Sequence, residues 1–505
     1  MKYLLGIDSG GTMTKAGIYD VAGNEIAVAK KKFDIILPGD GMTERDIGQF
    51  KDANFGAIRE AIGQSGVAPE DIAGVAIAGQ GNGMYPLDER GEPTHNGILS
   101  GDMRAKEYIK KWNADGTLDK ILPKTKQLLW AGQTTALIAW FADHDKSVLK
   151  KTKTIVTCKD YLRYLLTGQF CLELTEGSGL SAMDLDTKKL DPEIFAALGI
   201  AEYMDRFPQT VCKSTDICGR VTREASLLTG LAEGTPVMGG MFDISSCAIS
   251  TGIVDEKALC VIIGTWGINE YISKIPVVSR DMFMVTHYCV DGYYLMTEGS
   301  ATSAANLDWF VERLMPPAES GKARVYDEVN ALVESIPYDD SALLFFPFLY
   351  STNVNIDAKA GFIGLTARHT KAHMLRAIYE GVVFCHMYHI ERLYKFRDIP
   401  EVVRISGGGT KSRTWVQMFA DCLGLPVEVS AANELGTMGA AMCAGVGIGE
   451  FAGMKEAADV FVRISEVYKP DSERNKYYGK KYFAYKKFLE ALDGVWEVLG
   501  QIGKD

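Results

Sequence analysis

Two stretches of the chain, one at its start and one near its middle, share the same plan of strand, glycine loop and strand. The first is the apolar strand Tyr3 to Ile7, the loop D-S-G-G-T and a second strand at Ala16 to Tyr19. The other is the strand Leu259 to Ile263, the loop Gly264 to Gly267 and the strand Ile268 to Ile272. A strand directly after the loop differs from the strand–loop–helix plan of a Walker P-loop.

A second pair of segments also matches between the two halves. Ile72 to Ala78 is an apolar strand that ends in G-Q-G-N-G, and Val402 to Ser406 is another that ends in G-G-G-T-K-S. Glycine at a strand end lets a ligand approach the backbone closely. The shared order predicts a duplication with a cleft between the halves, and chance similarity of short glycine-containing strands is the alternative. We expect an N-terminal domain over residues 1–244 and a C-terminal domain over residues 245–505.

Helical periodicity accounts for three further segments. Apolar residues recur at helical spacing from Ala372 to Lys395. Trp415 to Gly424 is a second predicted helix, with Gly424 as its stop, and Asn475 to Leu499 is a third. Strands and helices together predict an α/β protein.

The composition excludes several classes of protein. A net charge of -11 with no basic run argues against nucleic acid or an anionic membrane as a partner. No apolar stretch approaches the roughly 20 residues of a membrane span, and the apolar run before Asp8 is too short for a signal peptide. The ten cysteines show no C-x-x-C spacing, which favours reduced thiols over a disulfide scaffold or a zinc site. We therefore expect a cytoplasmic protein.

The stretch T-G-L-A-E-G-T-P-V-M-G-G-M-F-D ends on a carboxylate, Asp243. Its apolar part, Val237 to Gly240, predicts a buried strand that places Asp243 over a glycine-lined crevice, where α/β folds bind ligands. A carboxylate there can act as a general base that takes the proton of a substrate hydroxyl as the hydroxyl attacks phosphorus. The alternative is a strand that simply ends in Asp at a turn.

Two glycine–threonine loops that face each other can bind phosphate, because backbone N–H groups close on phosphate oxygens and threonine adds a hydroxyl. The predicted phosphate-binding residues are Gly10, Gly11, Thr12 and Lys15 in the first loop and Gly264, Thr265 and Gly267 in the second. Asp8, at its strand end, is well placed to hold a hydrated Mg²⁺. A tight turn is the alternative for one such loop, and a solvated strand residue is the alternative for Lys15. Two loops together with Asp243 favour phosphoryl transfer.

These motifs resemble those of the FGGY family of carbohydrate kinases, in the same order and from Tyr3 to about Pro470. The resemblance rests on D-x-G-x-T-x-x-K, the segment that ends at Asp243, I-G-T-W-G, I-S-G-G-G-T-K-S-x-x-W-V-Q-M-F-A-D and E-L-G-T-M-G-A-A. It implies a two-domain actin-like ATPase fold of the ribonuclease H-like type, with ATP in a central cleft. It also implies that Asp243 activates a sugar hydroxyl and that Asp8 and Asp243 bind Mg²⁺ through water. By the same resemblance the nucleotide would lie against Gly407, Gly408, Gly409, Lys411 and Ser412, and residues 436–441 would help to close its site.

The resemblance further implies a sugar pocket in the N-terminal half. Gln80, Gly81 and Asn82 match the family's first polyol-binding loop, and I-L-S-G-D-M-R matches the segment that carries Asp102 and Arg104. A carboxylate, a guanidinium and two amides suit a polyhydroxylated substrate, which needs many directed hydrogen bonds. The alternative for Asp102 and Arg104 is a structural ion pair.

Departures from the family pattern bear on the substrate. The chain has Q-G-N-G where D-xylulose kinases carry Q-M-H-G, and Ser100 where the family has tryptophan. The combination of Q-G-x-G, I-L-S-x-D-x-R, G-T-W and L-F-F-P-F-L-Y-S-T-N looks most like the L-xylulose kinases, for which the product is L-xylulose 5-phosphate. Kinases of D-xylulose, ribulose, keto-gulonate or erythritol stay open as alternatives.

An actin-like module that binds ATP without phosphorylating a sugar is the alternative from a different class. It would need the phosphate loops but not the polar residues Gln80, Asp102 and Arg104. The resemblance is also compatible with a homodimer, which is common in related kinases. His369 and His373 are spaced four apart, as zinc ligands can be, but no acidic third ligand accompanies them and we interpret them as ordinary helix residues.

Overall fold

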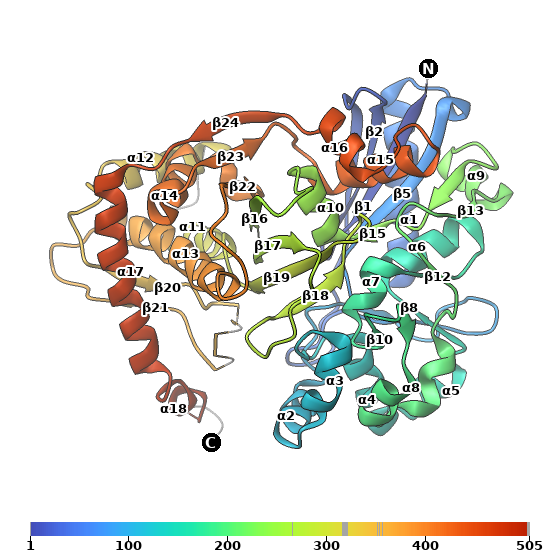
Figure 1. The fold of residues 1–505 in the computed structure, drawn as a ribbon, viewed down its shortest axis with the longest axis horizontal. Coiled ribbons are helices and arrows are strands. Elements are labelled where there is room, and N and C mark those ends of the chain that lie inside the picture. Colours follow the sequence, from blue (N-terminus) through green and yellow to red (C-terminus); the bar gives the residue numbers. More distant parts are fainter. Residues whose placement is uncertain are drawn as a thin grey trace. The chain divides into compact units, whose positions relative to one another are not determined.

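The structure of the protein, a computed structural model, describes residues 2–264, 266–315, 322–350, 352, 354, 355 and 357–501. The chain divides into two compact units (Figure 1). Unit 1 consists of Met1–Val254, Ile272–Met296 and Ala432–Val462, and unit 2 of Asp255–Tyr271, Thr297–Ala431 and Arg463–Asp505. Among the described residues, no helix is long and apolar enough to cross a membrane.

Unit 1 is built on a mixed sheet with the strand order β13-β14-β5-β1-β2-β3, to which β15 adds by pairing with β5. Its strands are β1 (Tyr3–Ser9), β2 (Met13–Asp20), β3 (Glu25–Lys32), β5 (Ile72–Gly79), β13 (Ile217–Arg220), β14 (Pro236–Met238) and β15 (Met241–Phe242). β1 and β15 both run parallel to β5, with Ser9 and Phe242 each in register with Gly79. The carboxyl ends of these three strands therefore lie at one edge of the sheet.

Two helices from distant parts of the sequence cover the two faces of this sheet. α1 (Ile47–Ser65) packs against β2 and β3, and α15 (Leu435–Gly447) packs against β1 and β5 (Figure 1). Side chains alternate along a strand, so Leu5 and Ile7 join the apolar core on the α1 side while Gly6 faces α15. A Cβ at residue 6 would lie 1.9 Å from the carbonyl oxygen of Thr437. Glycine is therefore required for α15 to approach β1 this closely.

The remainder of unit 1 is a set of short elements, most of which follow β5 in sequence. The helices are η1 (Pro69–Asp71), α2 (Lys106–Ala114), α3 (Thr117–Thr125), α4 (Thr134–His144), α5 (Lys146–Lys151), α6 (Cys158–Thr167), α7 (Leu174–Gly179), α8 (Pro192–Ala197), η2 (Ala201–Arg206), α9 (Arg223–Thr229), α10 (Asp243–Ser250) and α16 (Met454–Phe461). The strands are β4 (Glu44–Arg45), β6 (Tyr85–Leu87), β7 (Gly97–Ile98), β8 (Thr154–Val156), β9 (Leu172–Glu173), β10 (Met183–Asp184), β11 (Lys189–Leu190), β12 (Val211–Cys212) and β18 (Met284–His287). A second apolar cluster, which includes Trp112, Phe141 and Phe195, holds α2, α4 and α8 together.

Unit 2 contains a sheet with the strand order β19-β17-β16-β22-β23-β24. The strands of this part of the chain are β16 (Ala258–Ile263), β17 (Gly267–Ser273), β19 (Tyr294–Ser300), β20 (Leu344–Phe346), β21 (Gly361–Ile363), β22 (Val402–Ser406), β23 (Val427–Ser430) and β24 (Ile464–Tyr468). The helices are α11 (Ala305–Leu314), α12 (Lys322–Glu334), α13 (Lys371–Leu393), η3 (Gly408–Lys411), α14 (Arg413–Leu423), α17 (Ser472–Leu492) and α18 (Trp496–Gln501). β16 pairs antiparallel with β17 and parallel with β22, which repeats the pairing of β1 with β2 and β5.

The predicted α/β class with two strand–loop–strand repeats is confirmed, and β22 has the predicted bounds. Two predicted elements are interrupted. The expected strand Val237 to Gly240 stops at Met238, the end of β14, and strand structure resumes only with β15 at Met241, because Gly240 has a φ of 77° and breaks the extended backbone. The expected C-terminal helix from Asn475 to Leu499 is split into α17 and α18 around Gly494, as glycine disfavours helix interiors. The division of the chain at residues 244 and 245 stays a prediction.

Candidate active site

Asp243 lies at the sheet edge where β1, β5 and β15 end, as the first residue of α10. The two residues before it form β15, so a parallel strand pairing fixes the position of its backbone. Burial, and to a smaller extent the negative charge of Asp8, raise the pKa of the Asp243 carboxyl to about 7. A carboxylate with a pKa near neutrality is suited to act as a general base.

Asp8 belongs to a small charged network in unit 1. Its Oδ2 lies 3.7 Å from Lys15 Nζ, and Lys15 Nζ lies 2.9 Å from Glu434 Oε2. Burial raises the pKa of Asp8, and the positive charge of Lys15 only partly opposes this shift. Lys15 is thus an ion-paired strand residue beside Asp8. Glu434, the residue directly before α15, was not predicted from the sequence.

The first predicted phosphate loop, Gly10 to Thr12, joins β1 to β2. Two of its carbonyl groups are fixed by Arg45, which donates hydrogen bonds to the carbonyl oxygens of Gly10 and Gly11. Gly10 N–H donates to the carbonyl of Met13, and the Thr12 side chain is exposed. With its carbonyls anchored, the loop has the geometry to direct other backbone N–H groups outward, as an anion site requires.

The loop that follows β5 carries buried polar atoms that have no protein partner. Gln80 Nε2 and both side-chain polar atoms of Asn82 lack hydrogen bonds, although these residues are only 6% and 1% exposed. Asn82 has a φ of 61°, and a Cβ at residue 81 would lie 2.2 Å from the ring of Phe242. Buried polar groups without partners are costly, so a polar ligand at these atoms would remove a penalty.

Two further buried residues near Asn82 have unpaired polar atoms and were not found from the sequence. Glu176 Oε1 accepts a hydrogen bond of 2.7 Å from the Asn82 backbone N–H, while its Oε2 has no partner. Gln127 donates to the carbonyl of Ser178, two residues after Glu176 in α7, and its Oε1 is unpaired. Burial raises the pKa of the Glu176 carboxyl well above its ordinary range.

Asp102 and Arg104 form a buried pair with each other and with Glu44. Arg104 donates to Asp102 from Nε at 2.9 Å and from Nη2 at 3.0 Å, and also from Nη2 to Glu44 at 2.8 Å. The second oxygen of Asp102 accepts the backbone N–H of Thr43 as well. The two residues thus form an ion pair that holds the loop after β7, and their contact with a sugar stays a prediction.

The second predicted phosphate loop follows β16 in unit 2. Gly264 N–H donates to the carbonyl of Trp266, and the Gly264 carbonyl accepts from Ala304. Gly267 begins β17, where a Cβ would lie 3.1 Å from the ring of His386. Thr265 lies outside the described residues, so its predicted contact with phosphate stays a prediction.

A pocket of about 690 Å³ in unit 2 is lined by the predicted nucleotide residues Gly264, Gly408, Gly409, Lys411 and Ser412. Its other lining residues are Ile263, Ala304, Leu307, Asp308, Tyr326, Asp327, Asn330, Tyr379 and Trp415. This volume is in the range of small-molecule sites. The pocket therefore combines an apolar and aromatic wall with a glycine turn.

The glycine turn of this pocket depends on close packing against β16. Gly407 has a φ of 96°, and a Cβ there would lie 2.5 Å from the carbonyl oxygen of Ile263. Gly409 also packs against Ile263, whereas nothing lies within 4 Å of a Cβ at Gly408. Gly408 is thus the residue of the three that leaves open space for a ligand beside the backbone.

A hydrogen-bonded set of side chains fixes the far wall of the same pocket. Asn330 Oδ1 accepts from Tyr379 at 2.9 Å and from Ser412 at 2.6 Å. The rings of Tyr379 and Trp415 stack with 4.3 Å between centroids. Ser412 also caps the N-terminus of α14. Lys411 is exposed at the mouth, where its ammonium is available to a charged ligand.

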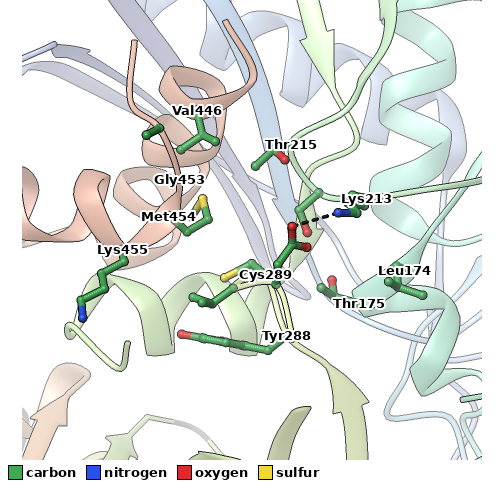
Figure 2. Close-up of a pocket in the computed structure, with 14 residues that line it drawn as sticks. Leu174, Thr175, Lys213, Thr215, Tyr288, Cys289, Val446, Gly453, Met454 and Lys455 are labelled. Atoms are coloured by element: carbon green, nitrogen blue, oxygen red, sulfur yellow. Dashed lines mark hydrogen bonds and ion pairs between the residues drawn. The ribbon is translucent and has the colours of Figure 1, made fainter. Parts of the chain in front are cut away.

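A separate hollow of about 310 Å³ lies in unit 1, and none of the predicted site residues lines it (Figure 2). Lys213 and Thr175 stand on one side of it, and Met454 and Lys455, at the start of α16, on the other. Lys213 forms an ion pair of 2.8 Å with Asp291.

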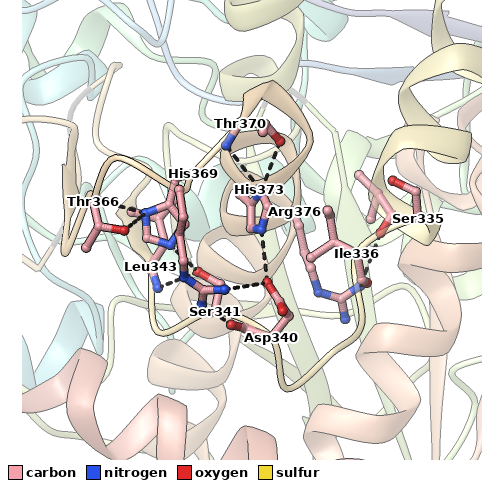
Figure 3. Close-up of polar contacts among 12 residues, drawn as sticks. Ser335, Ile336, Asp340, Ser341, Leu343, Thr366, His369, Thr370, His373 and Arg376 are labelled. Atoms are coloured by element: carbon pink, nitrogen blue, oxygen red, sulfur yellow. Dashed lines mark hydrogen bonds and ion pairs between the residues drawn. The ribbon is translucent and has the colours of Figure 1, made fainter.

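His369 and His373 have hydrogen-bond partners of their own (Figure 3). His373 contacts Thr370 through Nδ1 and Asp340 through Nε2, at 2.9 and 3.0 Å. His369 Nε2 lies 2.9 Å from Ser341 Oγ. These contacts order the start of α13, in agreement with a structural role for both histidines.

Comparison with protein families and known structures agrees with this arrangement. Residues 3–250 match the N-terminal domain, and residues 259–448 the C-terminal domain, of the FGGY family of carbohydrate kinases. The chain is 37% identical to the L-xylulose/3-keto-L-gulonate kinase of Escherichia coli K12, over 98% of both chains. It is 35% identical to a probable L-xylulose kinase of Pasteurella multocida, over 98% of this chain and all of the relative.

Solved structures show the same fold. The xylulose kinase of Rhodospirillum rubrum superposes with a TM-score of 0.87 at 26% identity, over 98% of this chain and 100% of that one. A ligand-bound xylulose kinase from Lactobacillus acidophilus superposes with a TM-score of 0.90 at 22% identity, over 99% and 100%. The two-domain actin-like fold and the family predicted from the motifs are both confirmed. The chain belongs to the FGGY family of carbohydrate kinases, and it is a sugar kinase that uses ATP as phosphoryl donor.

Proposed function

We propose that the protein transfers the γ-phosphoryl group of ATP to L-xylulose and forms L-xylulose 5-phosphate. The observation that carries this proposal is the carboxylate of Asp243, with a pKa near 7, at the same sheet edge as the unpaired amides of Gln80 and Asn82. The 37% and 35% identity to L-xylulose kinases over nearly whole chains supports the choice of sugar. The name of the Escherichia coli relative also includes 3-keto-L-gulonate, which is the second candidate substrate.

In this proposal the sugar is bound by unit 1. Gln80, Gly81 and Asn82 contact its hydroxyls, Asp102 and Arg104 complete that side of the pocket, and Asp243 accepts the proton of the attacking hydroxyl. Removing that proton as the oxygen bonds to phosphorus avoids a positively charged oxygen, while exclusion of water protects ATP from hydrolysis. The acceptor would be the C5 hydroxyl of the ketopentose.

The nucleotide is assigned to the pocket of unit 2. Gly407, Gly408, Gly409, Lys411 and Ser412 would lie near its phosphates and adenosine, and the stacked Tyr379 and Trp415 support the wall. The loop residues Gly264, Thr265 and Gly267 and the loop residues Gly10, Gly11 and Thr12 would donate to the phosphates, with Lys15 beside them.

Asp8 and Asp243 suit a hydrated Mg²⁺. After burial, the negative charge of Asp8 is the second cause of the raised pKa of Asp243. The two carboxylates therefore repel each other, and a bound cation would offset this repulsion. When bound, Mg²⁺ neutralises charge on the transferred phosphoryl group. Lys15 and Glu434 hold Asp8 in place.

We propose further that the enzyme works in the cytoplasm, and that it forms a homodimer.

The pH dependence of turnover tests the assignment of Asp243. Because the base must be ionised and its pKa is about 7, kcat/KM for the sugar should fall about tenfold per pH unit below pH 7 and level off above it. Asp8→Asn removes the neighbouring negative charge, so it should move the acid limb of the profile to lower pH. A profile that is flat from pH 5 to 8 would contradict the assignment.

Asn82→Gly tests the sugar pocket, because glycine accepts a φ of 61° while the amide is lost. We expect KM for the sugar to rise by about 10-fold or more, with KM for ATP unchanged, since only a sugar contact is removed. Asn113→Gly is a control for the loss of an amide, at an exposed residue of α2. An unchanged sugar KM in Asn82→Gly would remove Asn82 from the pocket.

The first experiment is a coupled assay of ADP release with Mg-ATP and a panel of L-xylulose, 3-keto-L-gulonate, D-xylulose, L- and D-ribulose, erythritol and glycerol. We expect kcat/KM to be highest for L-xylulose. A higher value for another member of the panel would keep the kinase and change the substrate. Absence of sugar-dependent ADP release from folded protein would favour the ATP-binding module without kinase activity.

A further inference from the structure

Three cysteine side chains meet in unit 1, away from the residues assigned to the reaction. Cys171 immediately precedes β9, Cys212 ends β12, and Cys218 lies in β13. The Sγ atoms of Cys171 and Cys212 are 3.2 Å apart, and all three sulfurs lie within 4.8 Å of one another. None of the three is in a disulfide. Their sequence separations of 41 and 6 residues match no familiar metal motif, so only the fold reveals the cluster.

We propose that Cys171, Cys212 and Cys218 form a binding site for a thiophilic divalent cation, Zn²⁺ being the expected one. Zinc–thiolate bonds of about 2.3 Å in a tetrahedral site place sulfur atoms roughly 3.8 Å apart. The Cys171–Cys212 separation of 3.2 Å and the upper limit of 4.8 Å for all three pairs differ from this value by at most about 1 Å at the upper limit, so small side-chain rotations suffice. Thiolates select soft or borderline cations over the magnesium that the reaction uses. Cys218 is partly exposed, so water can complete the fourth position.

A buried cation lies beside the cluster, since Arg163 donates a hydrogen bond to the backbone carbonyl of Cys171. The guanidinium of Arg163 on α6 is fully buried and acts electrostatically on all three thiols, and its Nε has no hydrogen-bond partner. Metal ligands must be deprotonated, and the positive charge of Arg163 favours the thiolate form of each of the three cysteines, while burial opposes it. The unpaired Nε of Arg163 is suited to donate a hydrogen bond to a ligated sulfur.

Charge decides between cations. Three thiolates and a divalent ion have a net charge of about −1 beside Arg163, whereas three thiolates and a monovalent ion such as Cu⁺ have about −2. The larger net charge is more costly to bury. Asp160 and Lys159 already pair with each other and with Arg163 or Glu173, so they offer no further compensation. A divalent ion is therefore favoured.

The cluster is connected to the chain that carries Asp243. Arg163 donates to the carbonyl of Gly239, at 2.7 Å, and a Cβ at residue 239 would lie 3.3 Å from Cys212 Sγ. A bound ion would tie the segments before β9, at β12 and in β13 together around this glycine turn. We expect it to stabilise unit 1 without taking part in phosphoryl transfer.

The test uses full-length protein treated with chelator and reductant and then titrated with CoCl₂ or ZnCl₂. We expect one equivalent of Co²⁺ to give a thiolate-to-cobalt charge-transfer band, which a cation at Asp8 and Asp243 cannot give. Zn²⁺ should abolish the band and raise the Tm. In Cys218→Ser, the mildest of the three changes, affinity should fall at least about 100-fold and the rise in Tm should disappear. Cys171→Ser and Cys212→Ser should behave alike, and Cys422→Ser, at a buried cysteine of α14, should bind as the parent does.

Three results would overturn the proposal. The first is a parent protein that binds no stoichiometric cation. The second is a charge-transfer band that survives in Cys218→Ser. The third is a Cys171–Cys212 disulfide in protein purified without metal, with no metal uptake after reduction, which would make the pair a redox site. Circular dichroism of each variant confirms that it is folded, and Cys218→Ser alone decides the case if another variant does not fold.

Discussion

Asp243→Asn is expected to lower kcat for the sugar by about 10²- to 10⁴-fold, which is the usual contribution of a positioned general base. The amide has nearly the same shape as the carboxylate but cannot accept the proton of the attacking hydroxyl. ATP affinity should fall far less than kcat, because the pocket assigned to the nucleotide is lined by residues of unit 2 and Asp243 would act on the nucleotide only through the hydrated Mg²⁺. The measurements are the coupled ADP assay and ATP binding followed by the fluorescence of Trp415, which lines that pocket.

Asp205→Asn is the matched control, since it makes the same change at an exposed residue of η2. It should keep the parent rate. The Asp243→Asn variant should also lose the acid limb of the pH profile in whatever activity remains, because the titrating group is gone. A variant that phosphorylates sugar at near the parent rate would show that Asp243 is not the base.

The parts of the site that were predicted from sequence are those that follow a strand directly. The predicted strands Tyr3 to Ile7, Ile72 to Ala78 and Val402 to Ser406 are apolar runs that glycine follows within three residues, and such a pattern fixes both a strand and the loop at its end. Asp8 and Gln80 were found because they lie in these loops or next to them. The order of the motifs then identified the family.

The residues that sequence reasoning missed come from segments that carry no such pattern. Glu434, just before a helix, forms an ion pair with Lys15, which lies more than 400 residues earlier in the chain. Glu176, in the six-residue helix α7, accepts a hydrogen bond from the backbone N–H of Asn82. Their positions depend on tertiary packing, such as the approach of α15 to β1 at Gly6. The three-cysteine cluster was missed for the same reason, because β9, β12 and β13 meet only in the fold.

Glu173 connects α7 with Ser214 and with Lys159 of α6. Glu173→Ala is expected to lower the free energy of unfolding by about 3–5 kcal/mol. Its buried carboxylate caps α7 by accepting the backbone N–H groups of Thr175 and Glu176, and it accepts the hydroxyl of Ser214. It also lies 3.4 Å from the buried ammonium of Lys159. Alanine would leave that ammonium with Asp160 as its one remaining ion-pair partner among the described residues, and would leave the helix uncapped. The free energy of unfolding, from urea titration, measures the loss.

The effect should extend to catalysis, because Thr175 Oγ1 accepts the backbone N–H of Phe242, the residue before Asp243, while donating to Glu173. We therefore expect kcat to fall even under conditions where Glu173→Ala is fully folded. Glu224→Ala, at an exposed residue of α9 that lies 3.8 Å from Lys51, is the control and should change stability by less than about 0.5 kcal/mol. If the two variants unfold at the same urea concentration, the buried network around Glu173 does not stabilise unit 1. If only stability falls and kcat is unchanged, the link from Glu173 to Asp243 is structural and has no effect on the base.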